Sequence, residues 1–226
     1  MGPQAGVELL RLMTAKSIED HAARANDDFP AVDLFSVPVP DFIGVDSPSR
    51  PVVSDMLDKR LRSVSQDEYV AFGIACNTVH MLADDLLTST DIPFISMIAA
   101  TVQKAMERSA ETVGILASPT TLQTDLYQSA AEQYGLRTVL PQEHEVIDIE
   151  RAIRSVIAGE QLDEARSSVQ RIATRMLGEG ADCIILGCTE LPLLFIDDTK
   201  DNEYVSSLSA LADELLRAYY EQGRPH

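Results

Sequence analysis

Two of the three cysteines in this sequence stand in closely similar surroundings, about half the chain apart. Cys76 ends the apolar run "AFGIAC" and is followed by Asn77 and Thr78. Cys188 ends the apolar run "DCIILGC" and is followed by Thr189. Both runs are typical of buried strands in a parallel sheet, whose carboxyl ends carry the binding crevice. A duplicated α/β unit would produce this spacing.

A thiol at the start of a helix is well placed for acid–base chemistry. Unpaired backbone N–H groups and the helix dipole favour negative charge there, so we expect both thiols to ionise more easily than a free cysteine, whose pKa is about 8.5. If two similar lobes face each other, Cys76 and Cys188 project from opposite walls of one cleft. One thiolate could then remove a proton from an acidic C–H group while the other thiol returns one to the opposite face, which inverts the carbon.

These motifs resemble those of a known family. "ACNTVH" and "LGCTEL" are similar to the two signature motifs of the aspartate/glutamate racemase superfamily. "MGPQAG", "GILASPTTLQTDLY" and "GADCIILGCTELPLL" are similar to its branch of amino-acid racemases, which includes the aspartate racemases. The resemblance extends over most of the chain. It implies a homodimeric enzyme that needs no cofactor, with Cys76 and Cys188 as catalytic thiols that face each other across a cleft between two α/β lobes.

The resemblance also assigns substrate-binding positions around the thiols. It implies that residues beside the two cysteines bind the α-carboxylate of the substrate, and that the turn "ASPTT" and the start of the chain line the pocket. The implied substrate-binding residues are Asn77, Thr78 and Thr189 beside the cysteines, Thr121 in the turn, and Met1 and Gly2 at the start.

Four features depart from the family pattern. In "ASPTT", Ser118 stands for a threonine and Thr120 for a glycine. Ser206 stands for an aspartate that precedes the last helix, and "PDFIGVDSPSR" offers Arg50 for an arginine that grips a side-chain carboxylate. The family also has a strand and a glycine before "MGP". Because this sequence begins at Met1, we expect the first lobe to lack that interior strand and to have an open edge with unpaired backbone groups.

Several neighbouring residues have plainer interpretations. Cys183 lies within its apolar run and is predicted to pack as a small buried hydrophobe. His80 either tunes the Cys76 thiol or is an ordinary surface or core histidine, and the second interpretation is favoured. Glu190 either serves as a base beside Cys188 or caps the helix that it begins. The other histidines are predicted to lie on the surface: His21, His144 and His226.

Apolar periodicity along the chain predicts alternating helices and strands. Helices are predicted over 4–25, 52–66, 78–90, 99–110, 121–135, 148–180 with an interruption at Gly159, and 206–223. Strands or extended segments are predicted over 31–40, 69–76, 92–98, 112–118, 136–141 and 181–188. Continuous apolar strands between helices indicate parallel sheets covered on both faces.

The predicted fold is therefore α/β. It has two pseudo-symmetric lobes, each a parallel sheet flanked by helices in a flavodoxin-like or Rossmann-like arrangement, with the active site between the lobes. Residues 1–96 and 205–226 are assigned to the N-terminal lobe, and residues 97–204 to the C-terminal lobe.

Composition limits the classes of partner. The 226 residues are 45% hydrophobic and carry a formal charge of −18, from 36 acidic and 18 basic residues. This charge repels phosphate backbones and anionic lipid surfaces, so nucleic-acid and membrane partners are not expected. The absence of a membrane-spanning run or signal peptide, and an odd number of cysteines, predict free thiols in the cytoplasm. No Cys or His cluster has metal-ligand spacing, so no metal site is predicted.

Together, the residues and the resemblance predict a cytoplasmic, cofactor-independent racemase of a small-molecule substrate, aspartate or glutamate, that uses two-base proton transfer. Two alternatives stay open: a related isomerase or racemase that acts on another small carboxylate or a hydantoin, and a non-catalytic binding relative. The sequence leaves open which amino acid and which enantiomer are preferred.

Overall fold

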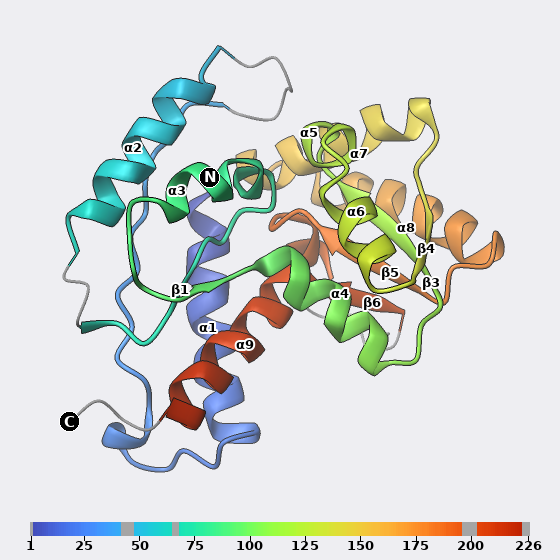
Figure 1. Cartoon of the computed structure of the whole chain (residues 1–226). Coiled ribbons are helices and arrows are strands. Elements are labelled where there is room, and N and C mark those ends of the chain that lie inside the picture. The colour runs from blue at the N-terminus through green and yellow to red at the C-terminus, as the bar shows by residue number, and fades with distance from the viewer. Residues whose placement is uncertain (1, 42–47, 65–67, 196–202, 223–226) are drawn as a thin grey trace.

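The computed structural model describes residues 2–41, 48–64, 68–195 and 203–222. Within these ranges the chain forms two parallel β-sheets of unequal size, with helices packed around both (Figure 1). The larger, C-terminal sheet has the strand order β4-β3-β5-β6, and the smaller, N-terminal sheet pairs β1 with β2. This arrangement confirms the predicted α/β fold class with two lobes.

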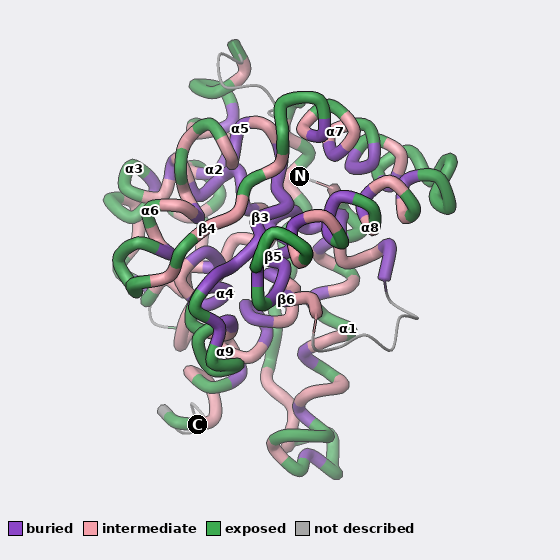
Figure 2. The backbone as a smooth tube through the Cα atoms, turned by 90° about the vertical axis from the view of Figure 1, so that its right-hand side faces the viewer, coloured by how far each residue is buried: buried purple, intermediate pink, exposed green. Residues whose placement is uncertain are grey.

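The C-terminal sheet holds the best-packed part of the molecule. Its four parallel strands are β3 (Thr112–Ala117), β4 (Arg137–Val139), β5 (Cys183–Gly187) and β6 (Tyr204–Ser206). β3 and β5 lie in the middle and are buried along their whole length (Figure 2). Because side chains alternate along a strand, Ile184 and Leu186 pack on one face of the sheet and Ile185 packs on the other.

Two pairs of helices cover the faces of this sheet. α7 (Glu143–Ala158) and α8 (Leu162–Gly178) pack on the face of Ile184, whereas α4 (Met97–Glu107) and α6 (Leu126–Gln133) pack on the face of Ile185. α7 ends at Gly159, whose φ of 71° is left-handed, so the predicted interruption is confirmed. Two short helices follow strands of this sheet: α5 (Pro119–Gln123) after β3 and the 3₁₀ helix η4 (Leu191–Leu194) after β5.

The N-terminal sheet is much smaller. β1 (Phe72–Gly73) pairs with β2 (Phe94–Ile95), and no second strand pairs with β1 in the described part of the chain. One apolar cluster joins this sheet to α1 (Pro3–Glu19) and α9 (Ser207–Gln222). Another joins it to α2 (Arg50–Arg62), α3 (Ala83–Leu87) and the 3₁₀ helix η3 (Thr78–Leu82). A further 3₁₀ turn, η1 (Asn26–Asp28), follows α1.

α9 packs against both halves of the molecule. It lies along α1 on one side and α4 on the other (Figure 1). Its Asp213 binds Lys16 of α1 at 2.6 Å and Lys104 of α4 at 3.1 Å. β6 spans the predicted lobe boundary at 204/205, and the exact division of the chain into lobes stays a prediction.

Three sequence predictions in the N-terminal half are wrong or incomplete. Residues 31–40 form no strand; prolines at positions 30, 38 and 40 lack the N–H group that a ladder needs, and no neighbouring strand pairs with the segment within the described ranges. The strand predicted over 69–76 is reduced to β1, and its residues are only partly buried. The helix predicted over 78–90 consists of η3 followed by α3. None of the helices in the described ranges combines the length and apolar character that crossing a membrane requires.

Candidate active site

Cys188 lies at the carboxyl end of β5, where its thiol meets a carboxylate. The Sγ atom donates a hydrogen bond to Glu190 Oε2 at 3.0 Å, and the Thr189 hydroxyl donates to the same oxygen at 3.0 Å. All three residues are buried. Burial, the Glu190 carboxylate and the nearby Cys76 together raise the pKa of the Cys188 thiol well above its usual range.

Cys76 follows β1 in the other half of the chain and is only partly buried. Its backbone N–H donates to Ile74 O at 2.8 Å, which turns the chain into η3. Backbone N–H groups of Val79 and Thr78 act on the sulfur and lower the pKa of Cys76. Desolvation by burial, followed by the Glu190 carboxylate, outweighs them and raises it.

The expectation that both thiols ionise more easily than a free cysteine is therefore wrong for this state of the protein. The predicted N–H groups are present at Cys76, but burial desolvates both sulfurs and the Glu190 carboxylate acts on both. Desolvation and a like charge disfavour a thiolate, and the few N–H donors do not offset them. Both cysteines thus favour the protonated thiol.

Glu190 links the start of α1 to the loop of Cys188 at this site. Its side chain caps no backbone N–H of η4 and instead binds the Cys188 thiol, so the structure favours its interpretation as a base. Gly2, at the start of α1, lies against the other carboxylate oxygen, because a Cβ atom there would come within 2.7 Å of Glu190 Oε1. The structure thus places Gly2 beside Glu190, while Met1 lies outside the described residues.

Asn77 is held by a hydrogen-bond network that sequence reasoning missed. The Tyr127 hydroxyl donates to Asn77 Oδ1 at 2.6 Å, and Asn77 Nδ2 donates to Ser207 Oγ at 3.1 Å. All three residues are buried. The Tyr127 ring also packs on Gly187, where a Cβ atom would come within 2.6 Å of Cε2, so only glycine fits one residue before Cys188.

Three buried hydroxyls form a triangle that joins the two halves of the chain. Thr78 Oγ1 lies 2.9 Å from Ser118 Oγ and 3.1 Å from Thr121 Oγ1, and Ser118 Oγ lies 2.9 Å from Thr121 Oγ1. Ser118 also caps α5, since its Oγ accepts from the Thr121 N–H at 3.3 Å. The Ser-Pro step in "ASPTT" is the local signal for this cap. Thr120 Oγ1, in the same turn, is buried without a hydrogen-bond partner among the described residues.

His80 is a core histidine rather than a partner of the thiol. Its Nδ1 atom lies 2.9 Å from Cys76 O, and its Nε2 atom accepts from the Met97 N–H at 3.1 Å. Because Nε2 accepts, the ring is neutral with its proton on Nδ1, which donates to the Cys76 carbonyl. Desolvation lowers the pKa of His80 to about 4. The side chain therefore pins the loop of Cys76 to the N-terminus of α4.

The remaining predicted residues lie elsewhere or play structural parts. Cys183 is buried in β5 as predicted, and burial raises its pKa to about 11. Arg50 is exposed at the start of α2, and within the described residues no hydrogen bond or ion pair links it to the thiols or to Glu190. Ser206 Oγ accepts from the Ser209 N–H at 3.3 Å and so serves the start of α9. His144 is exposed, His21 stacks on Tyr220, and His226 lies outside the described residues.

The described residues contain no group of three or more His, Cys, Asp or Glu side chains that could hold a metal ion. What they do contain is a buried carboxylate that accepts a hydrogen bond from one thiol and acts electrostatically on a second, one thiol from each half of the chain, with hydroxyl and amide groups nearby. Such a set can accept, hold and return protons, and it can donate hydrogen bonds to a small anion.

Comparison with known proteins places these features in a family. The sequence pattern of the Asp/Glu/Hydantoin racemase family matches residues 1–215. The chain is 34% identical over 130 residues to a glutamate racemase of Roseiflexus sp. (strain RS-1), a match that covers 54% of this chain and 44% of the relative. It is 27% identical over 139 residues to an uncharacterized protein of Pectobacterium carotovorum subsp. carotovorum, covering 61% of this chain and 92% of that one. The match therefore spans less than half of the Roseiflexus enzyme.

Solved structures share the fold. The Picrophilus torridus aspartate racemase superposes with a TM-score of 0.71 at 21% identity, covering 92% of this chain and 89% of the other. An aspartate racemase homologue from Pyrococcus horikoshii OT3 superposes with a TM-score of 0.68 at 24% identity, covering 93% of each chain. At these identities, the likeness establishes the architecture alone.

Proposed function

Because the chain belongs to the Asp/Glu/Hydantoin racemase family, we propose that it racemises an acidic amino acid, aspartate or glutamate, without a cofactor. We further propose that Cys76 and Cys188 carry the proton transfer. The observation that supports this most directly is the hydrogen bond from the Cys188 thiol to the Glu190 carboxylate, at a buried site where Glu190 also acts on Cys76.

In this proposal Glu190 generates the attacking thiolate. The carboxylate takes the proton of the Cys188 thiol along their 3.0 Å hydrogen bond, which leaves a Cys188 thiolate and a neutral Glu190. The thiolate removes the α-proton of one enantiomer, and the Cys76 thiol gives its proton to the opposite face of the resulting carbanion. The opposite enantiomer reacts in the reverse sense, with Cys76 as the base. Each acid–base group of this kind typically contributes about 10²- to 10⁴-fold in rate.

Substrate recognition rests on local donors. A chain with a charge of −18 repels an acidic amino acid at long range, so binding must come from hydrogen-bond donors at the site. The Thr189 hydroxyl, the Asn77 amide and the Thr78 and Thr121 hydroxyls supply them, and all four side chains are buried beside the thiols. Each group already has a partner in this structure: Thr78 pairs with Thr121, Thr189 donates to Glu190 and Asn77 donates to Ser207. A bound carboxylate would therefore replace some of these hydrogen bonds.

Proton exchange in D₂O tests the proposal. The protein is incubated with L-aspartate or L-glutamate, and the α-proton signal is followed by NMR together with the appearance of the D-enantiomer. We expect α-proton loss and racemisation with at least one of the two substrates. No exchange with either acidic amino acid, while all three thiols remain titratable, would favour a non-catalytic binding protein instead.

Cysteine variants test the assignment of the two bases. Cys76→Ala and Cys188→Ala should both abolish racemisation, whereas Cys183→Ala, in the middle of β5, should retain it and lose only stability. Cys76→Ser and Cys188→Ser should slow exchange of opposite enantiomers, because each sulfur serves one face. Equal loss for both enantiomers in each variant would contradict the two-base arrangement.

Titration of the thiols tests the role of Glu190. Since the Glu190 carboxylate raises the pKa of both cysteines, Glu190→Gln should move the midpoint of thiolate absorbance to lower pH and also reduce turnover. Glu160→Gln, on an exposed loop, is the matched control and should leave both unchanged. An unshifted thiolate titration would show that Glu190 does not act on the sulfurs.

A further inference from the structure

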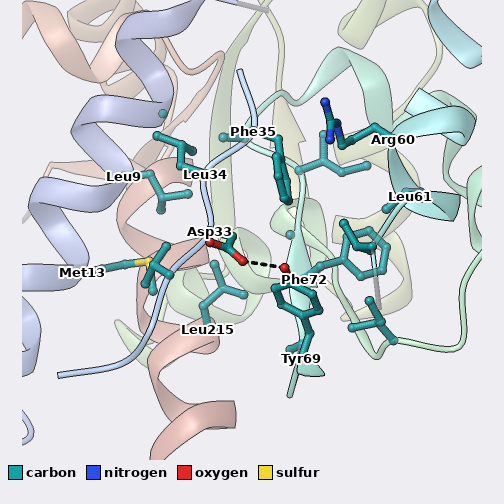
Figure 3. A pocket seen from close by; sticks show the side chains of 18 of the residues that line it. Leu9, Met13, Asp33, Leu34, Phe35, Arg60, Leu61, Tyr69, Phe72 and Leu215 are labelled. Carbon is teal, nitrogen blue, oxygen red and sulfur yellow. Dashed lines mark hydrogen bonds between the residues drawn. The ribbon is translucent and has the colours of Figure 1, made fainter. Parts of the chain in front are cut away.

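The proposed reaction needs a defined place for the substrate carboxylate beside the thiols. An apolar cavity of about 310 Å³ lies between α1, α2, the segment 30–37 and the chain around β1, but neither cysteine lines it (Figure 3). Leu9, Met13 and Phe72 are typical of its lining. Groups that hold a carboxylate at the thiols are therefore to be found at the carboxyl ends of the strands, where both cysteines lie.

Three adjacent strands of the C-terminal sheet end beside one another. β3 pairs with β5 as far as Gly187, and β5 pairs with β6 as far as Ser206. The end of β3 leads to two members of the hydroxyl triangle, and the end of β5 leads to Cys188. The end of β6 leads to Ser207, the first residue of α9, which is fully buried. Ser207 therefore lies at the same edge of the sheet as Cys188.

Ser207 holds one end of the Asn77 amide. Its Oγ atom accepts a hydrogen bond from Asn77 Nδ2 at 3.1 Å, while the Tyr127 hydroxyl donates to Asn77 Oδ1 at 2.6 Å. A planar amide that is fixed at both its oxygen and its nitrogen cannot turn about its side-chain bond, whereas one that is fixed at the oxygen alone can. Ser207 thus supplies the second of the two attachments that orient Asn77.

Asn77 is also the proposed carboxylate donor that has a hydrogen atom to spare. Its amide nitrogen carries two hydrogens, of which one is given to Ser207, and no hydrogen bond within the described ranges uses the other. The Thr189 hydroxyl gives its single hydrogen to Glu190. The hydroxyl triangle has three hydrogens and three contacts, so its own contacts use them all. A carboxylate can therefore engage the second Asn77 N–H without breaking an existing hydrogen bond.

We propose that Ser207 is a positioning residue for the substrate carboxylate, a role that rests on the proposed function. Ser207 does not touch the substrate. It fixes the orientation of the Asn77 amide, whose second N–H receives the carboxylate. A donor that is oriented before the substrate arrives lowers the cost of binding. Because the carboxylate is held alike in the bound substrate and in the transition state, Ser207 acts on KM rather than on kcat.

Ser207→Ala tests this role. The variant removes the acceptor of Asn77 Nδ2 and leaves the amide attached to Tyr127 alone. KM for the amino acid that is racemised should rise about five- to tenfold, while kcat should change by less than about twofold. A merely structural role would instead reduce the amount of folded enzyme, which lowers the apparent kcat at an unchanged KM. That outcome would overturn the proposal.

Ser17→Ala is the matched control. Ser17 in α1 is as fully buried as Ser207, and its hydroxyl has no hydrogen-bond partner in the described part of the chain. KM should be unchanged in this variant. Ser207→Thr keeps a hydroxyl at the tested position and should hold KM within about threefold of the native value. An equal rise of KM in Ser17→Ala would show that loss of any buried serine hydroxyl has this effect, and would contradict the assignment.

Nuclear magnetic resonance of the unmodified protein gives a test that does not depend on the folding of a variant. The two side-chain N–H protons of Asn77 give separate signals in protein labelled with ¹⁵N. Titration with L-aspartate or L-glutamate should shift the proton that is not bonded to Ser207, and should shift the other much less. Binding of the amino acid with no change at either proton would overturn the proposal.

These readouts separate the role of Ser207 from the proposed function. The titration requires binding but no turnover, and its dissociation constant replaces KM if the protein does not racemise. Binding that shifts the Asn77 signal without any racemisation would contradict the proposed function alone. Racemisation with an unchanged KM in Ser207→Ala would contradict the role of Ser207 alone. Absence of both binding and racemisation would contradict both.

Discussion

The two thiols of the site are held in different ways. Cys188 follows a five-residue strand that is buried throughout and has a parallel neighbour on each side. Cys76 follows a two-residue strand with one neighbour among the described residues. Regular sheet structure therefore positions one thiol, whereas side-chain contacts with distant parts of the chain position the other.

The contacts that hold the Cys76 loop come mainly from the C-terminal half. His80 ties its carbonyl to the start of α4, Tyr127 binds Asn77 from α6, and Thr78 meets the start of α5. The N-terminal half therefore relies on the C-terminal half for the geometry of the site. Substitutions that destabilise the C-terminal sheet should therefore disturb the geometry of both thiols. Substitutions at the contacts between the two halves should disturb Cys76 first.

The largest expected effect is on the free energy of unfolding, and it should differ between the two sheets. Ile185→Ala in β5 removes a fully buried side chain between α4 and α6, and should lower the free energy of unfolding by about 2–5 kcal/mol. Ile74→Ala, next to β1, removes a partly buried isoleucine and should cost less than about half as much. Urea denaturation followed by circular dichroism measures both. Equal costs would mean that the small sheet is packed as tightly as the large one.

The next effect appears at acid pH and concerns His80. Its pKa is lowered to about 4 in the folded protein, from 6.5, so the unfolded chain binds the extra proton between these values. The contribution of neutral His80 to the free energy of unfolding is complete above pH 6.5. It is lost as pH falls toward 4, by about 3 kcal/mol in total.

Urea denaturation at pH 7 and at pH 4.5 checks this dependence. The native protein should lose more stability over this range than His80→Gln, which cannot take up that proton. His144→Gln, at an exposed position, serves as the control and should behave like the native protein. Parallel losses in all three proteins would show that His80 is not held neutral by its two hydrogen bonds.

The sequence was informative where structure depends on local pattern. The strands predicted over 112–118 and 181–188 match β3 and β5 closely, because a continuous apolar run is both the signal for a buried strand and the cause of its burial. The break at Gly159 was found because glycine adopts the left-handed conformation that ends a helix. Both features need only neighbouring residues to be recognised.

Prediction failed where the outcome depends on distant partners. The segment 31–40 has the apolar content of a strand, but a strand also needs a neighbour, and its sequence does not show whether one is present. The direction of the thiol pKa shifts was wrong because the local N–H groups were visible in the sequence, whereas burial and the reach of Glu190 to Cys76 were not. Nothing local marks Tyr127 as the partner of Asn77.

Tyr127→Phe tests whether the C-terminal half positions the Cys76 loop. The variant keeps the ring on Gly187 but leaves Asn77 Oδ1, buried, without its donor, and should lower stability by about 1–2 kcal/mol. It should also lower kcat more than stability alone explains, with thiolate titration of Cys188 unchanged. Tyr134→Phe removes a hydroxyl that binds Gln103 on the surface and should cost less than about 0.5 kcal/mol. Equal effects of the two substitutions would show that the Tyr127–Asn77 hydrogen bond does not position the Cys76 loop.

The smallest expected effect concerns the junction of the two halves. Asp213 lies between Lys16 of α1 and Lys104 of α4, and these side chains are between about a fifth and a third exposed, so solvent screens the pairs in part. Asp213→Asn should therefore cost about 1 kcal/mol or less. Asp55→Asn, which breaks an exposed pair with Lys59 within one helix, should cost still less.

The shape of the unfolding transition is the more informative readout of this pair of variants. If Asp213 couples the halves through α9, Asp213→Asn should separate the unfolding midpoints reported by a probe near β1 and a probe near β5, whereas Asp55→Asn should leave them coincident. Coincident midpoints in both variants would mean that apolar packing of α9 on α1 and α4 alone joins the halves. The ion pairs would then add nothing to the support that the C-terminal half gives to Cys76.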